Sequence, residues 1–124
     1  MAVDPKGADL KRYLAEDPGG PVVMLNLLRF QPTGGRESYA KYAAALRDTY
    51  LDKYGAEVLY AGRGSTVLVA EPGQEWDAVL IVRYPSRQAF CQMVADPEYQ
   101  QFTHFRTEAL TEAVLQATVP VESL

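Results

Sequence analysis

The chain has 124 residues, of which 48% are hydrophobic and 23% charged, and its net charge is −4. This balance is typical of one globular domain, and the acidic charge argues against a general nucleic-acid-binding surface. No apolar run reaches the ~20 residues of a membrane-spanning helix, and the single cysteine, Cys91, excludes an intrachain disulfide and a multi-cysteine metal site.

The apolar spacing predicts helices and strands in a regular order. Asp4-Pro5 is typical of a helix cap followed by a proline at the first helical position. Gly55 is expected to end the second helix and Ser86 to cap a later one, and Asp96-Pro97 repeats the first signal. In chain order we expect a helix at about 5–16, a strand at 22–30, a helix at 36–54, strands at 57–62, 66–70 and 76–84, a helix at 87–95, a helix from 97 that breaks near 104, and a strand at 114–119.

This order predicts an α+β domain with a ferredoxin-like βαββαβ core. We expect one domain over 1–124, in which 1–20 form an extra N-terminal helix and turn and 21–119 form the core. The core is a four-stranded antiparallel sheet with two main helices on one face. The strands at 22–30 and 76–84 lie in the centre of that topology, and they are also the most apolar strands of the chain.

The strand at 22–30 is apolar on both faces, because successive residues of a strand point to opposite sides. We assign one alternate set to the helices: Val23, Leu25 and Leu27. We place the following side chains on the opposite, open face: Val22, Met24, Asn26, Leu28, Phe30, Val79, Ile81 and Arg83. A one-residue error in this assignment inverts every position of the strand.

An open apolar face of this size needs a cover. At about 25 cal/mol per Å², covering it is worth several kcal/mol. A second copy of the chain can supply the cover through a two-fold interface, and two four-stranded sheets then face each other as an eight-stranded barrel. The alternative is a monomer whose terminal segments fold over the sheet. We expect the homodimer.

Five short motifs carry a resemblance to a known family: Val23-Met24-Leu25-Asn26-Leu27-Leu28, Tyr60-Ala61-Gly62, Trp76-Asp77-Ala78, Tyr84-Pro85-Ser86 and Asp96-Pro97-Glu98-Tyr99. Together they resemble an uncharacterised bacterial family of the dimeric α/β-barrel superfamily, over about Pro21 to Thr118. The resemblance implies the ferredoxin-like fold and the barrel dimer, but no activity. Distant superfamily members include cofactor-free monooxygenases, haem-degrading enzymes and lactone isomerases, and no catalytic motif or haem-ligand signature of theirs is matched here.

Three polar residues of the central strands are candidates for ligand binding. Asn26 interrupts the most apolar strand, so it is either an amide that orients a ligand or a structural amide with its own partners. Arg83 can bind an anionic group, or it can form an ion pair with Asp77 or with an acidic residue of a second copy. Asp77 is the third candidate for ligand binding. Alternatively, its side chain stabilises the end of its strand.

The remaining candidates lie outside those strands. Tyr60 and Tyr99 can donate phenolic hydrogen bonds into a pocket, or they can be core tyrosines with a polar tip. His104 is the one side chain that titrates near neutrality without a strong perturbation, so it can be a general base, a capping residue or a surface residue. Arg106 lies close to His104 near the expected helix break, where the mouth of a site can lie.

Three functions follow from different classes of protein. The first is a dimeric domain that binds a small apolar or anionic molecule. The second is a cofactor-independent enzyme, monooxygenase- or isomerase-like, in which Asn26 and Arg83 orient the substrate and His104 or Tyr60 moves a proton. The third is a structural dimer whose cavity is filled by its own side chains. We expect a cytoplasmic protein with no metal, no cofactor, no nucleic acid and no membrane as partner.

Overall fold

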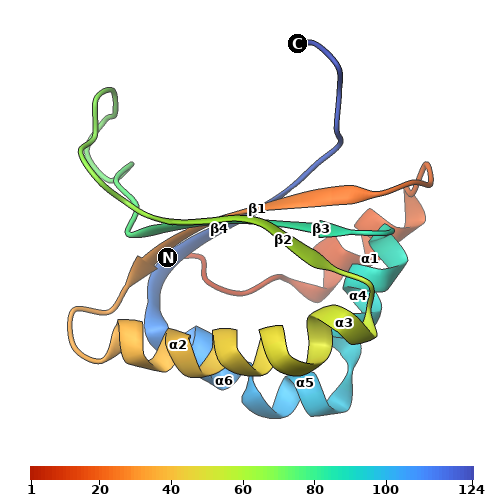
Figure 1. The fold of residues 1–124 in the computed structure, drawn as a ribbon, viewed down its shortest axis with the longest axis horizontal. Helices are drawn as coiled ribbons and strands as arrows, with labels where there is room; N and C mark the ends of the chain where they lie inside the picture. Colours follow the sequence, from red (N-terminus) through yellow and green to blue (C-terminus); the bar gives the residue numbers. More distant parts are fainter.

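Four antiparallel strands form one sheet in the order β2-β3-β1-β4 (Figure 1). The computed structural model describes residues 1–124. The strands are β1 (Val22–Phe30), β2 (Glu57–Arg63), β3 (Ala78–Tyr84) and β4 (Leu110–Thr118). The two most apolar strands, β1 and β3, lie in the centre of the sheet, as predicted.

The helices all lie on one side of this sheet (Figure 1). They are α1 (Gly7–Ala15), α2 (Gly35–Ala45), the π-helix η1 (Leu46–Tyr50), α3 (Leu51–Lys53), α4 (Arg87–Ala95), α5 (Pro97–Phe102) and α6 (His104–Ala109). On the other side, the loop 64–77 and the C-terminal segment 119–124 rise away from the sheet. The predicted α+β, ferredoxin-like arrangement is confirmed, and the C-terminal segment does not fold back over the open face.

Local capping signals explain where several helices begin and end. Ser86 Oγ accepts a hydrogen bond of 3.0 Å from Ala89 N at the start of α4. Asp96 Oδ1 accepts one of 2.9 Å from Glu98 N at the start of α5. Gly55, which follows α3, has φ +70°, a conformation that a glycine adopts without strain. These three predicted signals are confirmed.

The predicted cap at Asp4-Pro5 is wrong. Helix α1 begins at Gly7, and the residue before it, Lys6, makes no side-chain cap. The Asp4 carboxylate instead accepts hydrogen bonds from Arg106 and Thr107 of α6. Asp4 therefore bonds to α6, which is distant in the sequence, and does not cap α1. These bonds hold residues 2–6 against α6.

Three further boundaries differ from the prediction. Residues 66–70 form no strand, because the loop 64–77 rises beyond the edge of the sheet and finds no neighbouring strand to pair with. The last strand begins at Leu110 instead of 114, since it pairs with β1 up to Phe30. The π-helix divides the expected helix 36–54.

The predicted faces of β1 are inverted. Five residues placed on the open face lie under the helices or pack with them: Val22, Met24, Asn26, Leu28 and Phe30. Three residues assigned to the helices lie on the open face: Val23, Leu25 and Leu27. Both alternate sets are apolar, so the pattern of β1 alone does not decide. The register does, because Met24 pairs with Val82, which is 2% exposed beneath the helices, and paired residues point to the same side.

Asp96 joins three segments of the helical layer. Its carboxylate accepts hydrogen bonds from Lys53 Nζ at 2.8 Å, from the Tyr54 hydroxyl and from Glu98 N. The bonds from Lys53 and Tyr54 hold the pKa of Asp96 well below its usual range. The ionised carboxylate therefore stabilises the fold, and this contribution disappears when the group is protonated.

We expect Asp96→Asn to lower the melting temperature most at neutral pH. The pKa of Asp96 is lower in the folded state, so its contribution is complete above the unfolded-state value of about 3.9 and is lost as the pH falls below it. Melting curves by circular dichroism from neutral to acid pH should show the two proteins converging below about pH 4. Asp48→Asn, at an exposed carboxylate, is the control. A difference that stays constant with pH would contradict this assignment.

Candidate functional site

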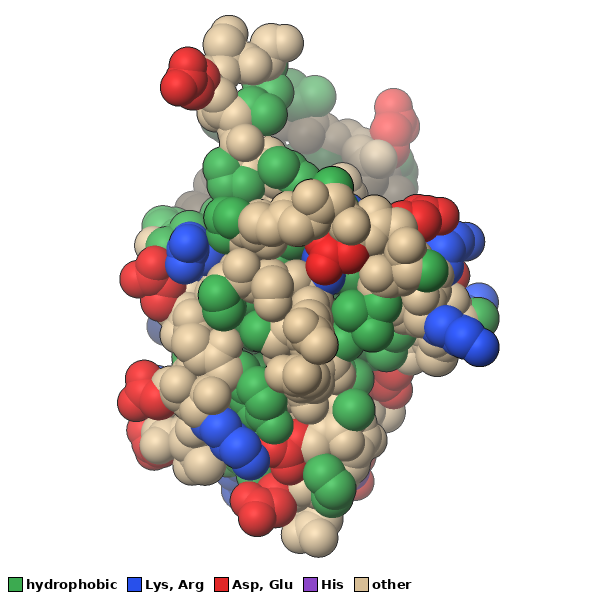
Figure 2. All heavy atoms as spheres, turned by 90° about the vertical axis from the view of Figure 1, so that its right-hand side faces the viewer, with side chains coloured by type: hydrophobic (Ala, Val, Ile, Leu, Met, Phe, Trp, Pro, Cys, Tyr) green, Lys and Arg blue, Asp and Glu red, His purple; other side chains and the backbone are tan.

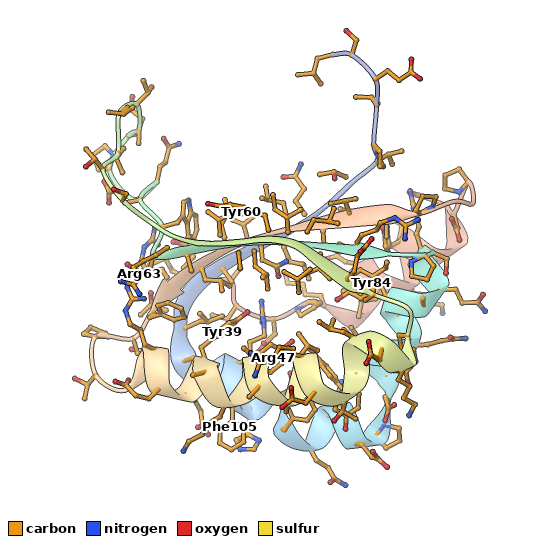
Figure 3. The ribbon with its side chains drawn as sticks, in the orientation of Figure 1. Tyr39, Arg47, Tyr60, Arg63, Tyr84 and Phe105 are labelled. Atoms are coloured by element: carbon orange, nitrogen blue, oxygen red, sulfur yellow. The ribbon has the colours of Figure 1, made fainter.

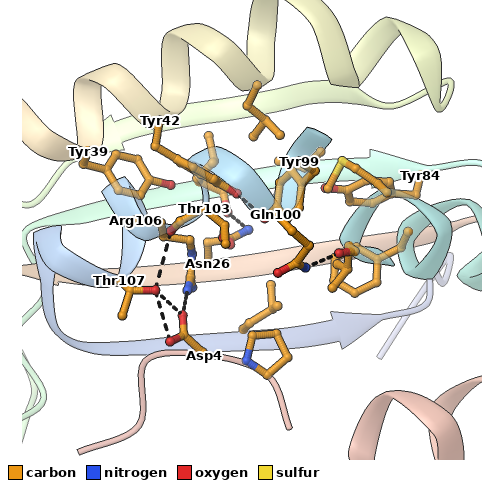
Figure 4. A pocket seen from close by; sticks show the side chains of 18 residues that line it. Asp4, Asn26, Tyr39, Tyr42, Tyr84, Tyr99, Gln100, Thr103, Arg106 and Thr107 are labelled. Atoms are coloured by element: carbon orange, nitrogen blue, oxygen red, sulfur yellow. Dashed lines mark hydrogen bonds and ion pairs between the residues drawn. The ribbon is translucent and has the colours of Figure 1, made fainter. Parts of the chain in front are cut away.

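A cavity of about 250 Å³ lies between the sheet and the helices (Figure 4). Asn26 on β1, Leu80 on β3 and Leu115 on β4 contribute from the sheet, and Tyr39 and Tyr42 on α2 contribute from the opposite side. Asn26 reaches this cavity because β1 turns the face that carries Met24 and Leu28 toward the helices. The inverted face of β1 therefore places the Asn26 amide at the cavity.

Tyrosines form much of the cavity wall. Tyr42 Oη and Tyr99 Oη are hydrogen-bonded to each other at 2.7 Å, whereas Tyr39 and Tyr84 line the cavity without a hydrogen-bond partner. Burial raises the pKa of Tyr39 to about 12, and it raises the pKa values of Tyr42 and Tyr84 as well. These phenols are therefore protonated at neutral pH and can donate hydrogen bonds into the cavity.

Arg106, on α6, is the buried cation of the cavity and is 6% exposed. Its Nη1 donates to Val3 O at 2.6 Å and to Asp4 Oδ1 at 3.2 Å. Its Nη2 is buried and has no hydrogen-bond partner. An unsatisfied buried donor is costly and rare in folded proteins. Arg106 therefore lines the cavity and has one buried donor that the chain leaves unsatisfied.

Asn26 is only weakly satisfied by the chain. Its Nδ2 donates to Leu80 O at 3.3 Å and to Met24 O at 3.5 Å, which are long distances for such bonds. Its Oδ1 accepts no hydrogen bond from another residue. The Asn26 amide is thus held by two long hydrogen bonds at the wall of the cavity.

The structure brings three of the predicted site residues together. Asn26, Tyr99 and Arg106 all line the cavity. They come from β1, α5 and α6, so only the folded chain makes them neighbours. Sequence reasoning missed Asp4, which it interpreted as a cap. It also missed Tyr39 and Tyr84, which line the cavity from α2 and β3.

The other four predicted site residues lie elsewhere. Tyr60 lies on the open face, on the opposite side of the sheet from Tyr39 and Tyr84 (Figure 3). Arg83 lies on the same open face, opposite Val23, and forms no ion pair within the protomer.

Asp77 and His104 have local partners. Asp77 Oδ2 accepts a hydrogen bond of 2.8 Å from Phe30 N, which is the strand-end role considered as its alternative. His104 is exposed, and its Nδ1 lies 3.0 Å from Gln101 O. The geometry thus does not place His104 and Tyr60, the expected proton-transfer groups, around a shared ligand.

No three His, Cys, Asp or Glu side chains come together in a cluster that could ligate a metal ion. None of the helices combines the length and the apolar character needed to cross a bilayer.

We expect Asn26→Leu to change the free energy of unfolding by less than about 1 kcal/mol, because the lost hydrogen bonds are long and the new side chain is apolar and of similar size. Ser38→Ala is the comparison, since Ser38 Oγ donates a short bond of 2.8 Å to Phe105 O. Urea unfolding of both variants gives the two values. A loss at Asn26 of more than about 2 kcal/mol would show that its amide is a structural tie.

The comparisons with known proteins agree with this fold. The RPA0582 protein of unknown function from Rhodopseudomonas palustris is 30% identical, with a TM-score of 0.90 over 98% of each chain. A dimeric ferredoxin-like protein of unknown function from Jannaschia sp. CCS1 is 10% identical, with a TM-score of 0.62 over 82% of this chain and 100% of that one. A ferredoxin-like dabb family protein from Mesorhizobium loti is also 10% identical, with a TM-score of 0.59 over 82% of this chain and 98% of that one.

A search of curated proteins gives no match to the chain. The family assignment rests on a comparison with family models. The family model of a domain of unknown function, DUF1330, matches residues 32–118. The resemblance to an uncharacterised family with a ferredoxin-like fold is confirmed, and the chain belongs to the DUF1330 family.

Proposed function

We propose that this protein is a homodimeric small-molecule-binding domain. Each cavity holds a small, mainly apolar molecule, and Arg106 binds the polar group of that molecule. The observation that carries the proposal is that Arg106, a residue of the cavity lining, leaves its buried Nη2 without a hydrogen-bond partner. A ligand that accepts a hydrogen bond there would satisfy a donor that the chain leaves unsatisfied.

The lining defines the kind of molecule. Eleven of the 18 lining residues are hydrophobic, so most of the ligand is apolar. The volume of about 250 Å³ lies below the usual range for drug-sized ligands. It equals the volume of about eight waters, which suits a ligand of on the order of ten non-hydrogen atoms.

The same lining favours binding over turnover. A general base or acid works best with a pKa near the working pH. The pKa values of the cavity tyrosines Tyr39, Tyr42 and Tyr84 are raised further from neutrality, and that of Tyr39 is about 12. A structural dimer with a filled interior is less well supported, because the cavity is open between Asn26 and the tyrosine wall.

The open face of the sheet supports the dimer. Its central residues are half-exposed and apolar: Val23, Leu25, Leu27, Val79 and Ile81. Figure 2 shows two segments projecting from the top of the molecule, with hydrophobic side chains at their bases. In the loop 64–77, Leu68 is 90% and Val69 97% exposed. Apolar residues this exposed suit burial against a partner.

The projecting loop is held at its base. Arg29 Nη2 donates to Gly73 O at 2.7 Å and to Glu75 O at 2.6 Å. The guanidinium also lies 4.4 Å from the centre of the Trp76 ring, and it pairs with Glu112. The loop is thus positioned before any partner arrives, which lowers the entropic cost of association. The dimeric neighbour from Jannaschia supports the same assembly.

We expect light scattering to give twice the protomer mass for the native protein, and Leu25→Glu to give a monomer. Leu25 pairs with Ile81 at the centre of the open face, so a carboxylate there would be buried without a partner in the dimer. Leu14→Glu places the same charge on α1, where Leu14 is 39% exposed, and should leave the dimer intact. A native protein that is monomeric at micromolar concentration would refute the dimer.

A screen of small carboxylates, phenols and lactones tests the cavity. At 100-fold excess over Kd, a bound ligand should add about 2.7 kcal/mol of stability, visible as a thermal shift and as a mass adduct under native conditions. Leu80→Phe narrows the cavity and should remove binding, whereas Leu14→Phe on α1 should not. If no compound binds the wild type, or if Leu80→Phe binds as well as the wild type, the cavity is not the site.

A further inference from the structure

The N-terminal strap, residues 2–6, is held against the cavity by contacts distant in the sequence. Ala2 O accepts a hydrogen bond of 2.9 Å from Ala113 N. Asp4 accepts from Arg106 Nη1 at 3.2 Å and from Thr107 Oγ1 at 3.0 and 3.1 Å (Figure 4). Asp4 and Pro5 line the cavity, and they also line a neighbouring hollow of about 660 Å³ beside α1. The strap thus separates the two spaces.

Asp4 and Arg106 are the two charged side chains of the cavity lining, and they differ in burial. The side chain of Arg106 is 7% exposed and that of Asp4 is 47% exposed. The Asp4 carboxylate therefore already has access to water. The guanidinium does not, and a buried charge left without a partner is strongly destabilising. Any group that displaces Asp4 must itself be an anion.

The cavity lining holds several hydrogen-bond donors. Arg106 Nη2, the hydroxyls of Tyr39 and Tyr84, and one hydroxyl of the Tyr42–Tyr99 pair are available to donate. A carboxylate is the matching group, because its two oxygens accept up to about four hydrogen bonds and pair with a guanidinium in a two-pronged geometry. That geometry uses two guanidinium nitrogens, and Asp4 occupies Nη1.

We propose that Asp4 is a built-in substitute for the ligand's carboxylate. The ligand is a small monocarboxylate with an apolar body, and its binding exchanges one carboxylate for another on Arg106 and releases the N-terminal strap. The exchange keeps the buried guanidinium paired throughout. This inference rests on the proposed function, since it specifies the ligand and the regulation of the same cavity.

The test compares an acid with its uncharged amide of the same size. The probes are 3-phenylpropanoate and 3-phenylpropanamide, measured by calorimetry on the wild type, Asp4→Asn and Asp9→Asn. Asp4→Asn removes the competing charge, so it should bind the acid about tenfold more tightly, as expected when a binding-competent state becomes more populated. Its affinity for the amide should not change. Asp9, an exposed carboxylate on α1, is the control and should behave as the wild type.

Hydrogen exchange follows the strap directly. The Ala113 amide is bonded to Ala2 O, so its exchange should become faster when the acid binds and the strap leaves. The amide probe should not accelerate it. A ligand that merely stabilises the fold would slow exchange at Ala113.

The outcomes separate this inference from the proposed function. Equal binding of acid and amide, or weaker binding of the acid by Asp4→Asn, overturns the exchange of carboxylates and leaves the cavity as a binding site. Slower exchange at Ala113 with the acid bound also overturns it. If neither probe binds any of the three proteins and the screen is also negative, both proposals are overturned.

Discussion

One buried guanidinium organises this protein. Arg106 lies beneath the sheet with part of its hydrogen-bonding capacity used by residues 3 and 4 and part unused. Charged groups this deeply buried need partners, so the N-terminal strap is drawn to α6 instead of capping α1. Tyrosines of α2, β3 and α5 line the same cavity as Arg106. The positive charge of the cavity lining and the position of the strap therefore both involve Arg106.

The two faces of the sheet carry different kinds of surface. Its helix-covered face carries Asn26 and the apolar floor of the cavity, and its open face carries the apolar surface and the projecting loop that suit a second copy. Because side chains alternate along a strand, β1 can contribute to both surfaces within nine residues. In the proposed dimer, a change on the open face therefore affects assembly and leaves the residues of the cavity unchanged.

Local signals in the sequence predicted much of this fold. Ser86 and Asp96 cap helices with backbone groups two or three residues away, so short motifs were sufficient to identify them. The face of β1 could not be predicted from its own pattern, because both sets of alternate residues are apolar and the pairing with Val82 decides.

The candidate site could be predicted only in part. Asn26 stood out as a polar residue in an apolar strand, and Tyr99 and Arg106 were also selected. Their common cavity depends on tertiary packing, as does the contact of Arg106 with Asp4, 102 residues away in the chain. An Asp-Pro pair has the same local pattern whether the carboxylate caps a helix, as Asp96 does, or pairs with a distant cation, as Asp4 does.

A crystal structure of the native protein soaked with 3-phenylpropanoate tests the central claim most directly. The account predicts electron density for the probe between the sheet and the helices, with its carboxylate oxygens within hydrogen-bonding distance of Arg106 Nη1 and Nη2 and with Asp4 turned into solvent. Density for the probe on the open face, or an occupied cavity in which Asp4 still holds Arg106, would contradict it.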